Sequence, residues 1–216
     1  MRIYFLSKSI APTGVLCQAG GEGDVMSRID HALVVGGTGM LCGVSLALAR
    51  RARIVSVIAR HPHRLKDLQE EAGAFGGLIH PVAVDYRETR RLISSLLEVR
   101  QSVGVFSLSV VWVHSTAPEA PLAIAGVVSN PVDSCPYYHV LSSAVVAPSS
   151  AVNRWRTRFE LFPGIEYHEV ILGFTPDPRG SRWLTHEEIC KGVLEAIELR
   201  VPSMVVGTVT PWSARP

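Results

Sequence analysis

Apolar residues along the chain gather in seven short runs, separated by stretches with a helical period. Within each run the apolar residues are nearly continuous and do not alternate with polar ones. Continuous apolar runs of this length are typical of strands buried on both faces, as in a parallel sheet. We therefore expect strands at residues 32–37, 53–59, 78–84, 107–113, 138–144, 166–174 and 203–209.

Between these runs, apolar residues recur at spacings of three and four, which places them on one face of a helix. Thr185 and Glu188 have the spacing of a capping box at the start of such a helix. Alternation of strands and helices predicts an α/β fold with a doubly wound, mostly parallel sheet in a single domain over residues 26–216. Two of the expected faces consist of Leu92, Ile93, Leu96 and Leu97, and of Ile189, Val193, Ala196 and Ile197.

The first 25 residues lack this pattern. A short apolar patch is interrupted by Lys8, by Pro12 and by a glycine-rich run, so the segment is a weak match to a secretory signal and too broken for a membrane span. We expect residues 1–25 to be a disordered leader or a misassigned start, because Met26 precedes the first strand by only a few residues.

Composition narrows the class of protein. The chain has 216 residues, of which 47% are hydrophobic and 19% charged, and its formal net charge is +2. No block of basic residues interleaved with aromatics indicates a nucleic-acid surface, and no segment indicates a membrane partner. The four cysteines are Cys17, Cys42, Cys135 and Cys190. Because they form no closely spaced pair, we expect no metal site, and we expect a cytoplasmic location.

A glycine-rich turn follows the first predicted strand. Gly36, Gly37, Thr38, Gly39 and Met40 connect it to the first predicted helix. Glycines at such a turn let backbone amides and a helix N-terminus approach a phosphate pair, because side chains there would keep the phosphates away. The turn therefore favours a dinucleotide site. The alternative is a tight connection between strand and helix with no ligand.

The end of the second predicted strand bears on which dinucleotide binds. An unphosphorylated adenosine ribose calls for an acidic residue at this place, whereas a 2′-phosphate calls for a cation. The residue here is Arg60, and no carboxylate follows until Asp67. We expect NADP(H) as the cofactor, and the same absence argues against S-adenosylmethionine methyltransferases. The alternative is that Arg60 is a solvated loop residue.

From about Ala32 to Val209 the chain resembles the short-chain dehydrogenase/reductase superfamily, specifically its atypical members. The glycine turn carries the resemblance, although Cys42 stands where a third glycine is usual and Gly43 follows it. The resemblance implies a doubly wound Rossmann fold, a small-molecule substrate and a small homo-oligomer. It also implies cofactor contacts from the ends of the third, fourth and sixth strands, at Asp85, Tyr86, Ser115, Gly173 and Phe174.

The catalytic positions fit the family only in part. Its carbonyl reductases use a serine after the fifth strand, a tyrosine as proton donor, and a lysine four residues after the tyrosine. Ser142 and Ser143 stand in the serine's place, but no tyrosine and no lysine lie between them and residue 165. Arg154, Arg156 and Arg158 occupy that segment, and a guanidinium can clamp a carboxylate but cannot donate a proton at neutral pH.

His114, at the end of the fourth predicted strand, is the side chain best suited to transfer a proton near pH 7. Two functions stay open. The first is an NADP(H)-dependent oxidoreductase that acts on a small carbonyl or imine through Ser142, Ser143 and His114. The second is a catalytically inactive NADP(H)-binding sensor or scaffold. The loop at 175–183 is either an ordinary connector or a lid over the substrate.

Overall fold

The computed structural model describes residues 29–147, 155–178 and 180–216. The expected leader, residues 1–25, lies outside the described residues. Seven strands form one parallel sheet in the order β3-β2-β1-β4-β5-β6-β9, which confirms the doubly wound sheet in a single domain. The strands are β1 (His31–Val35), β2 (Ile54–Ala59), β3 (Ile79–Ala83), β4 (Leu108–Trp112), β5 (Cys135–Ser142), β6 (Ile165–Leu172) and β9 (Ser203–Val206).

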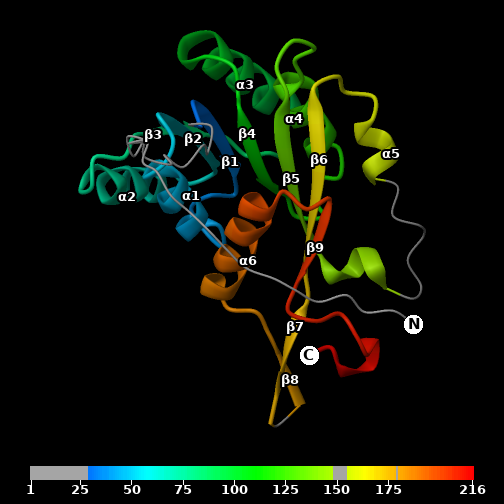
Figure 1. Cartoon of the computed structure of the whole chain (residues 1–216). Coiled ribbons are helices and arrows are strands. Elements are labelled where there is room, and N and C mark those ends of the chain that lie inside the picture. The colour runs from blue at the N-terminus through cyan, green and yellow to red at the C-terminus, as the bar shows by residue number, and fades with distance from the viewer. Residues whose placement is uncertain (1–28, 148–154, 179) are drawn as a thin grey trace, which may run out of the picture.

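Helices cover both faces of this sheet (Figure 1). One face packs on α1 (Cys42–Ala49), α2 (Pro62–Gly73) and α6 (His186–Leu199). The opposite face packs on α3 (Thr89–Val103), α4 (Ala120–Val128) and α5 (Trp155–Phe159). β1 is buried along its whole length between the two layers, because it lies in the middle of the sheet.

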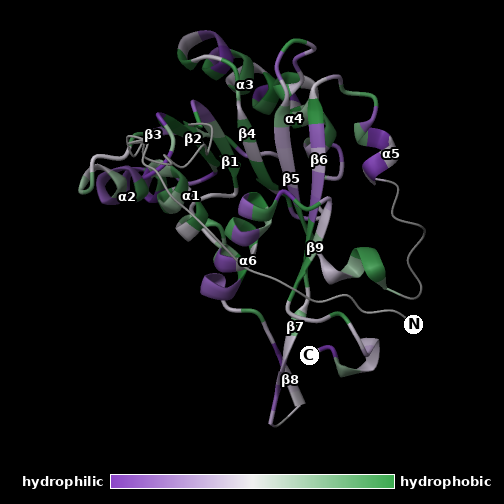
Figure 2. Cartoon of the chain, viewed as in Figure 1, coloured by the Kyte–Doolittle hydropathy of each residue, from purple (hydrophilic) through white to green (hydrophobic). Residues whose placement is uncertain are grey.

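The start of α6 and the face that it buries both follow from its sequence. It begins with the predicted capping box, in which the Glu188 amide donates to Thr185 Oγ1 and the Thr185 amide donates to the Glu188 carboxylate. Along its length Figure 2 shows green and purple in alternation, as expected for a helix that turns one face to a core. Ile189, Val193 and Ala196 form that buried face. No helix in the described part of the chain is long and apolar enough to cross a membrane.

A small antiparallel hairpin extends below the main sheet, formed by β7 (Phe174–Asp177) and β8 (Gly180–Trp183) (Figure 1). It occupies the segment predicted to be a connector or a lid. The segment that follows β9 runs back to the base of the hairpin, where Phe174 and Thr208 exchange two backbone hydrogen bonds of 2.9 and 2.8 Å. A short 3-10 helix, η2 (Trp212–Ala214), then lies beside the hairpin, and Ser181 Oγ donates to the carbonyl of Ala214.

An aromatic cluster joins β5 and β6 to α5. The rings of Tyr137, His139, Phe159 and Tyr167 contact one another, with centroids 4.2 Å apart for Phe159 and Tyr167. His139 is almost fully buried, and its Nδ1 lies 3.0 Å from the hydroxyl of Tyr167. Burial lowers the pKa of His139 to about 3, because the apolar surroundings disfavour the charged imidazolium.

This burial predicts a loss of stability in mild acid. In the unfolded chain His139 is protonated below about pH 6.5, whereas in the folded chain it stays neutral down to about pH 3. Because the unfolded state binds the extra proton, the free energy of unfolding falls as the pH falls. The slope from this residue approaches about 1.4 kcal/mol per pH unit. Urea unfolding between pH 7.5 and 4.5 measures it. His139→Gln should flatten the slope, whereas the exposed His63→Gln should leave it unchanged. Equal slopes for all three proteins would contradict the prediction.

Candidate functional site

Parallel pairing brings the predicted site residues to one edge of the sheet. Val35 of β1 pairs with Ile58 of β2 and with Val111 of β4, so the glycine turn, Arg60 and His114 all follow paired strand ends. Trp112 of β4 pairs with Val140 of β5, and Ser142 of β5 pairs with Leu172 of β6. In doubly wound folds ligands bind beyond the carboxyl ends of the strands, where this edge lies.

The local structure requires a glycine at two of the three turn positions, and for a different reason at each. Gly36 has a φ of +80°, which other residues rarely adopt, and a Cβ on it would lie 3.1 Å from the carbonyl oxygen of Trp112. A Cβ on Gly37 would lie only 2.4 Å from Ser45 Oγ, so packing against α1 requires this glycine. A Cβ on Gly39 would meet nothing within 4 Å. Structure therefore explains Gly36 and Gly37, while Gly39 borders open space.

The helix that follows the turn, α1, begins without a side-chain cap from its N-cap residue. Leu41 stands at its N-cap and makes no side-chain capping hydrogen bond, and its first turn holds no acidic residue. Gly43 performs a packing role, since a Cβ on it would lie 3.0 Å from the sulfur of Cys190 on α6. The glycine displaced by one position from the family pattern thus lets α6 lie close to α1.

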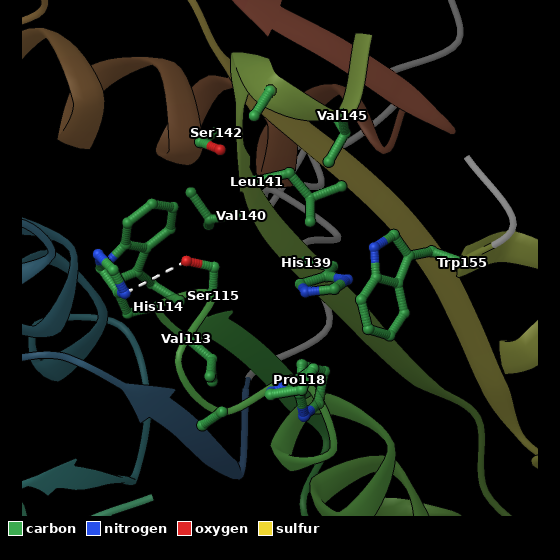
Figure 3. Close-up of a pocket in the computed structure, with 14 residues that line it drawn as sticks. Val113, His114, Ser115, Pro118, His139, Val140, Leu141, Ser142, Val145 and Trp155 are labelled. Atoms are coloured by element: carbon green, nitrogen blue, oxygen red, sulfur yellow. Dashed lines mark hydrogen bonds between the residues drawn. The ribbon is translucent and has the colours of Figure 1, made fainter. Parts of the chain in front are cut away.

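A cavity of about 370 Å³ opens between the ends of β4 and β5 (Figure 3). His114 and Ser115 line it from the β4 side, and Ser142 lines it from β5. The Nδ1 of His114 lies 3.4 Å from Ser115 Oγ, and the His114 amide donates to the Tyr86 hydroxyl over 3.4 Å. Tyr86 thereby joins the exit of β3 to the exit of β4. The remaining lining residues are Trp112, Val113, Ala117, Pro118, Pro121, His139, Val140, Leu141, Ala144, Val145 and Trp155.

A second cavity, of about 240 Å³, lies on the α6 side of β5. It shares Trp112 and Ser142 with the first, so the two cavities meet at these side chains. It reaches from the glycine turn to the hairpin and the last residues of the chain. The remaining lining residues are Met40, Ser143, Leu172, Gly173, Trp183, Leu184, His186, Ile189 and Arg215.

The two serines after β5 differ in exposure. Ser142 is exposed and borders both cavities. Ser143 begins the 3-10 helix η1 (Ser143–Val146), is 1% exposed, and its Oγ has no hydrogen-bond partner among the described residues. A buried hydroxyl without a partner costs free energy, so Ser143 Oγ is available to a ligand in the second cavity.

The expected cofactor residues that follow β2 and β3, Arg60 and Asp85, lie at the same edge but outside both cavities. Arg60 is exposed and forms no ion pair with any other described residue. Asp85 is held by the guanidinium of Arg87, with Nη2 2.7 Å from Oδ2, and these hydrogen bonds lower the pKa of the Asp85 carboxyl. Arg60 adds a smaller effect of the same sign, which shows that it lies near Asp85.

The turn after β6 is also explained by packing. A Cβ on Gly173 would lie 2.1 Å from the carbonyl oxygen of Thr208, so the close approach of the two backbones requires this glycine. Phe174 is buried and lines neither cavity, and its amide and carbonyl are both bonded to Thr208. Gly173, in contrast, does border the second cavity.

The segment where the family has its tyrosine and lysine is described only from Trp155. Arg154 lies outside the described residues, as does Tyr4–Lys8, the chain's single tyrosine–lysine pair with a spacing of four. Arg156 donates to the carbonyls of Tyr167 and Pro202, and Arg158 lies over the ring of Trp155. Neither arginine of α5 reaches the cavities.

Sequence reasoning missed several residues of these cavities, among them His139, Trp155 and Arg215. His139 and Trp155 line the first, and their rings meet edge to face with centroids 4.9 Å apart. Arg215 lines the second. Their side chains reach the site only through tertiary packing, so no local motif marks them. Tyr137 and Tyr138 are buried, and their hydroxyls donate to the carbonyls of Pro121 and Ile197.

No protein-family model matches the sequence, and no curated protein matches it. Solved structures with a similar backbone exist, and those described below have low sequence identity to this chain. A short-chain dehydrogenase/reductase from Mycobacterium marinum has 18% identity and a TM-score of 0.63, covering 84% of this chain and 95% of its own. A short-chain dehydrogenase from Sphingobium yanoikuyae in complex with NADPH has 14% identity and a TM-score of 0.64, covering 86% and 92%.

A putative D-mannonate oxidoreductase from Haemophilus influenza with bound NAD has 9% identity and a TM-score of 0.60, covering 87% of this chain and 96% of its own. These likenesses extend over nearly the whole of each protein. At such identities they concern the path of the backbone. The chain therefore has the fold of the short-chain dehydrogenases/reductases.

Proposed function

We propose that this chain binds NADP(H) along the carboxyl edge of the sheet and reduces a small carbonyl or imine compound. One observation carries the proposal: the open space beside Gly39, in the turn before α1, lies at the same sheet edge as two cavities that meet at Ser142 and Trp112. A dinucleotide needs a phosphate site and a cavity for its reactive end at one edge.

The residues present fit an NADP(H) dinucleotide. Gly39 and the first turn of α1 would hold the phosphates, since neither a Cβ nor an acidic side chain opposes them. Arg60, exposed and without an ion-pair partner among the described residues, would hold the 2′-phosphate. Asp85, Tyr86, Ser115 and Gly173 complete the set that we assign to the cofactor's surroundings. Phe174, which the sequence also suggested, is buried and lines neither cavity, so we leave it out of this set. The bound cofactor supplies a hydride.

Hydride addition to the carbonyl carbon leaves negative charge on the oxygen, which the protein must stabilise and then protonate. Ser142 is the exposed hydroxyl shared by both cavities, so it is placed to donate a hydrogen bond to that oxygen. His114 lines the same cavity and is exposed, so a protonated imidazole there can give its proton to the oxygen and recover it from solvent. The product is an alcohol or an amine.

A second function is favoured by the tyrosines. In the described part of the chain no tyrosine lines either cavity: Tyr137, Tyr138 and Tyr167 are buried, and Tyr86 accepts a hydrogen bond from the His114 amide. A chain without the family's proton donor would serve as an NADP(H)-binding sensor or scaffold. NADPH consumption against a panel of aldehydes, ketones, quinones and imines distinguishes the two functions.

The cofactor preference is tested at Arg60. Arg60→Asp should weaken NADPH binding roughly tenfold or more, because it removes a charge-assisted contact worth about 1.5–3 kcal/mol and adds a repulsion. NADH binding should stay equal or improve. Fluorescence titration of both nucleotides measures this, with Arg90→Asp on α3 as a control for net charge. If both nucleotides weaken alike, Arg60 does not select the 2′-phosphate.

The proton-transfer step is tested at His114 and Ser142. His114→Ala should lower turnover by roughly a hundredfold or more while NADPH affinity stays nearly constant, because general acid catalysis typically contributes this much. Ser142→Ala should lower turnover by a similar factor, through loss of the hydrogen bond to the developing oxyanion. A His114→Ala protein that loses NADPH affinity but keeps turnover would place His114 in the cofactor site and not in proton transfer.

A further inference from the structure

One guanidinium at the second cavity forms no ion pair with a carboxylate in the described part of the chain. Arg215, near the end of the chain, lines this cavity, and its buried Nε has no hydrogen-bond partner in the part of the chain that the structure describes. None of the ion pairs found among residues 29–147, 155–178 and 180–216 involves it. An arginine carries its charge at all physiological pH values, so a guanidinium half-withdrawn from water is a site for an anion.

The surrounding structure fixes this side chain. Its Cζ lies 4.9 Å from the ring centroid of Trp183 on β8 and 4.9 Å from that of Trp212 on η2. Stacking on aromatic rings leaves the edge of a guanidinium free to donate hydrogen bonds in its own plane. The bond from Ser181 Oγ to Ala214 holds the two tryptophan-bearing segments together. Arg215 is therefore oriented before any ligand arrives.

The carboxylate of Glu188, at the start of α6, is already paired. Arg182 donates to both carboxylate oxygens of Glu188 over 2.8 and 2.9 Å, and Glu188 also accepts the Thr185 amide. Glu187 lines a different cavity, on the outer side of α6. His186, at the first position of α6, lines the same cavity as Arg215.

A second polar group in the cavity also lacks a partner. Ser143 lines it at 1% exposure with its Oγ unbonded. Two groups that can donate hydrogen bonds, from η1 and from the last residues of the chain, therefore border one volume of about 240 Å³. The remaining walls are largely apolar: Met40, Trp112, Leu172, Leu184 and Ile189. This combination fits an anionic group attached to an apolar or small body.

We propose that Arg215 and Ser143 form an anion subsite in the second cavity that binds a carboxylate of the substrate or the diphosphate of the cofactor. The identity of these two ligands rests on the proposed function, since a substrate carboxylate and a cofactor diphosphate both belong to an NADP(H)-dependent reduction. Carboxylate and phosphate oxygens share the chemistry that a guanidinium fork recognises. A substrate carboxylate bound here would place its carbonyl beside Ser142, which borders the same cavity.

The test uses the full chain and three probes: inorganic pyrophosphate, oxamate and NADPH. Oxamide is the neutral counterpart of oxamate. Calorimetry in low-salt buffer measures the affinity for each probe. Pyrophosphate, oxamate and NADPH are each titrated into the protein alone. Oxamate and oxamide are then titrated in the presence of saturating NADP. The variants are Arg215→Gln, Arg215→Lys and Ser143→Ala. Lys191→Gln is the control, because it removes one exposed positive charge from α6 outside the cavity.

Arg215→Gln should weaken the bound anion about tenfold or more, and Arg215→Lys by less, because the charge remains while the fork is lost. Loss of oxamate binding with unchanged NADPH affinity identifies the substrate carboxylate. Loss of pyrophosphate and NADPH binding identifies the cofactor diphosphate. Oxamide should not bind, and Lys191→Gln should behave as wild type.

The proposal is overturned if neither anion binds the wild type, or if Arg215→Gln binds both as the wild type does. If Arg215→Gln fails to fold, Ser143→Ala provides the test of the subsite. This variant should fold, because removing an unpartnered buried hydroxyl leaves the melting temperature equal or higher. Unchanged anion affinity in Ser143→Ala then refutes the subsite. A wild type that fails to bind NADPH refutes the proposed function instead, since the pyrophosphate and oxamate titrations do not depend on it.

Discussion

The hydrogen-bonded register of the parallel strands is the constraint on which the rest of this molecule depends. Seven strands in parallel register bring all their carboxyl ends to one edge, so residues more than a hundred positions apart in sequence become neighbours. The register itself is maintained by burial: the apolar side chains of β1 and β4 are covered on both faces, and any slip would move polar residues into the core. A site at this edge follows from the core and not from local motifs.

Close backbone approaches divide this edge into separate compartments. Gly36 brings the first turn against the carbonyl of Trp112, and Gly173 lets the chain after β6 lie against Thr208. Between these two contacts stand Trp112 and Ser142, which separate one cavity from the other while bordering both. Glycines expected to touch the cofactor thus also serve packing, and Gly39 is the one turn glycine whose surroundings leave space for a ligand.

Polar groups around the site are either bonded within the protein or left available, and this difference separates structural from functional roles. The guanidinium groups of Arg87, Arg156 and Arg182 all donate hydrogen bonds to carboxylates or carbonyls of the chain. Asp85 is likewise engaged with Arg87, so a contact to an adenine would compete with an existing ion pair. Because a buried polar group needs a partner, the available ones, Ser143 Oγ and Arg215 Nε, are the informative exceptions.

The sequence by itself determined the fold class, the seven strands and the capping box at Thr185, because these depend on local periodicity and on contacts within a few residues. It left details open where coverage by a distant element decides. Leu97 shares the predicted apolar face of its helix but is 50% exposed, and the fifth strand begins at Cys135 and ends at Ser142, earlier at both ends than its apolar run suggested.

Only the tertiary structure decided which residues share a cavity. Gly36, Arg60 and Ser142 could be placed at the sheet edge from the order of elements, since each directly follows or ends a strand. His139, Trp155 and Arg215 could not, because their positions depend on the packing of α5 and on the return of the last residues to the β7–β8 hairpin. Such contacts join segments far apart in the chain, and no periodicity or spacing in the sequence records them.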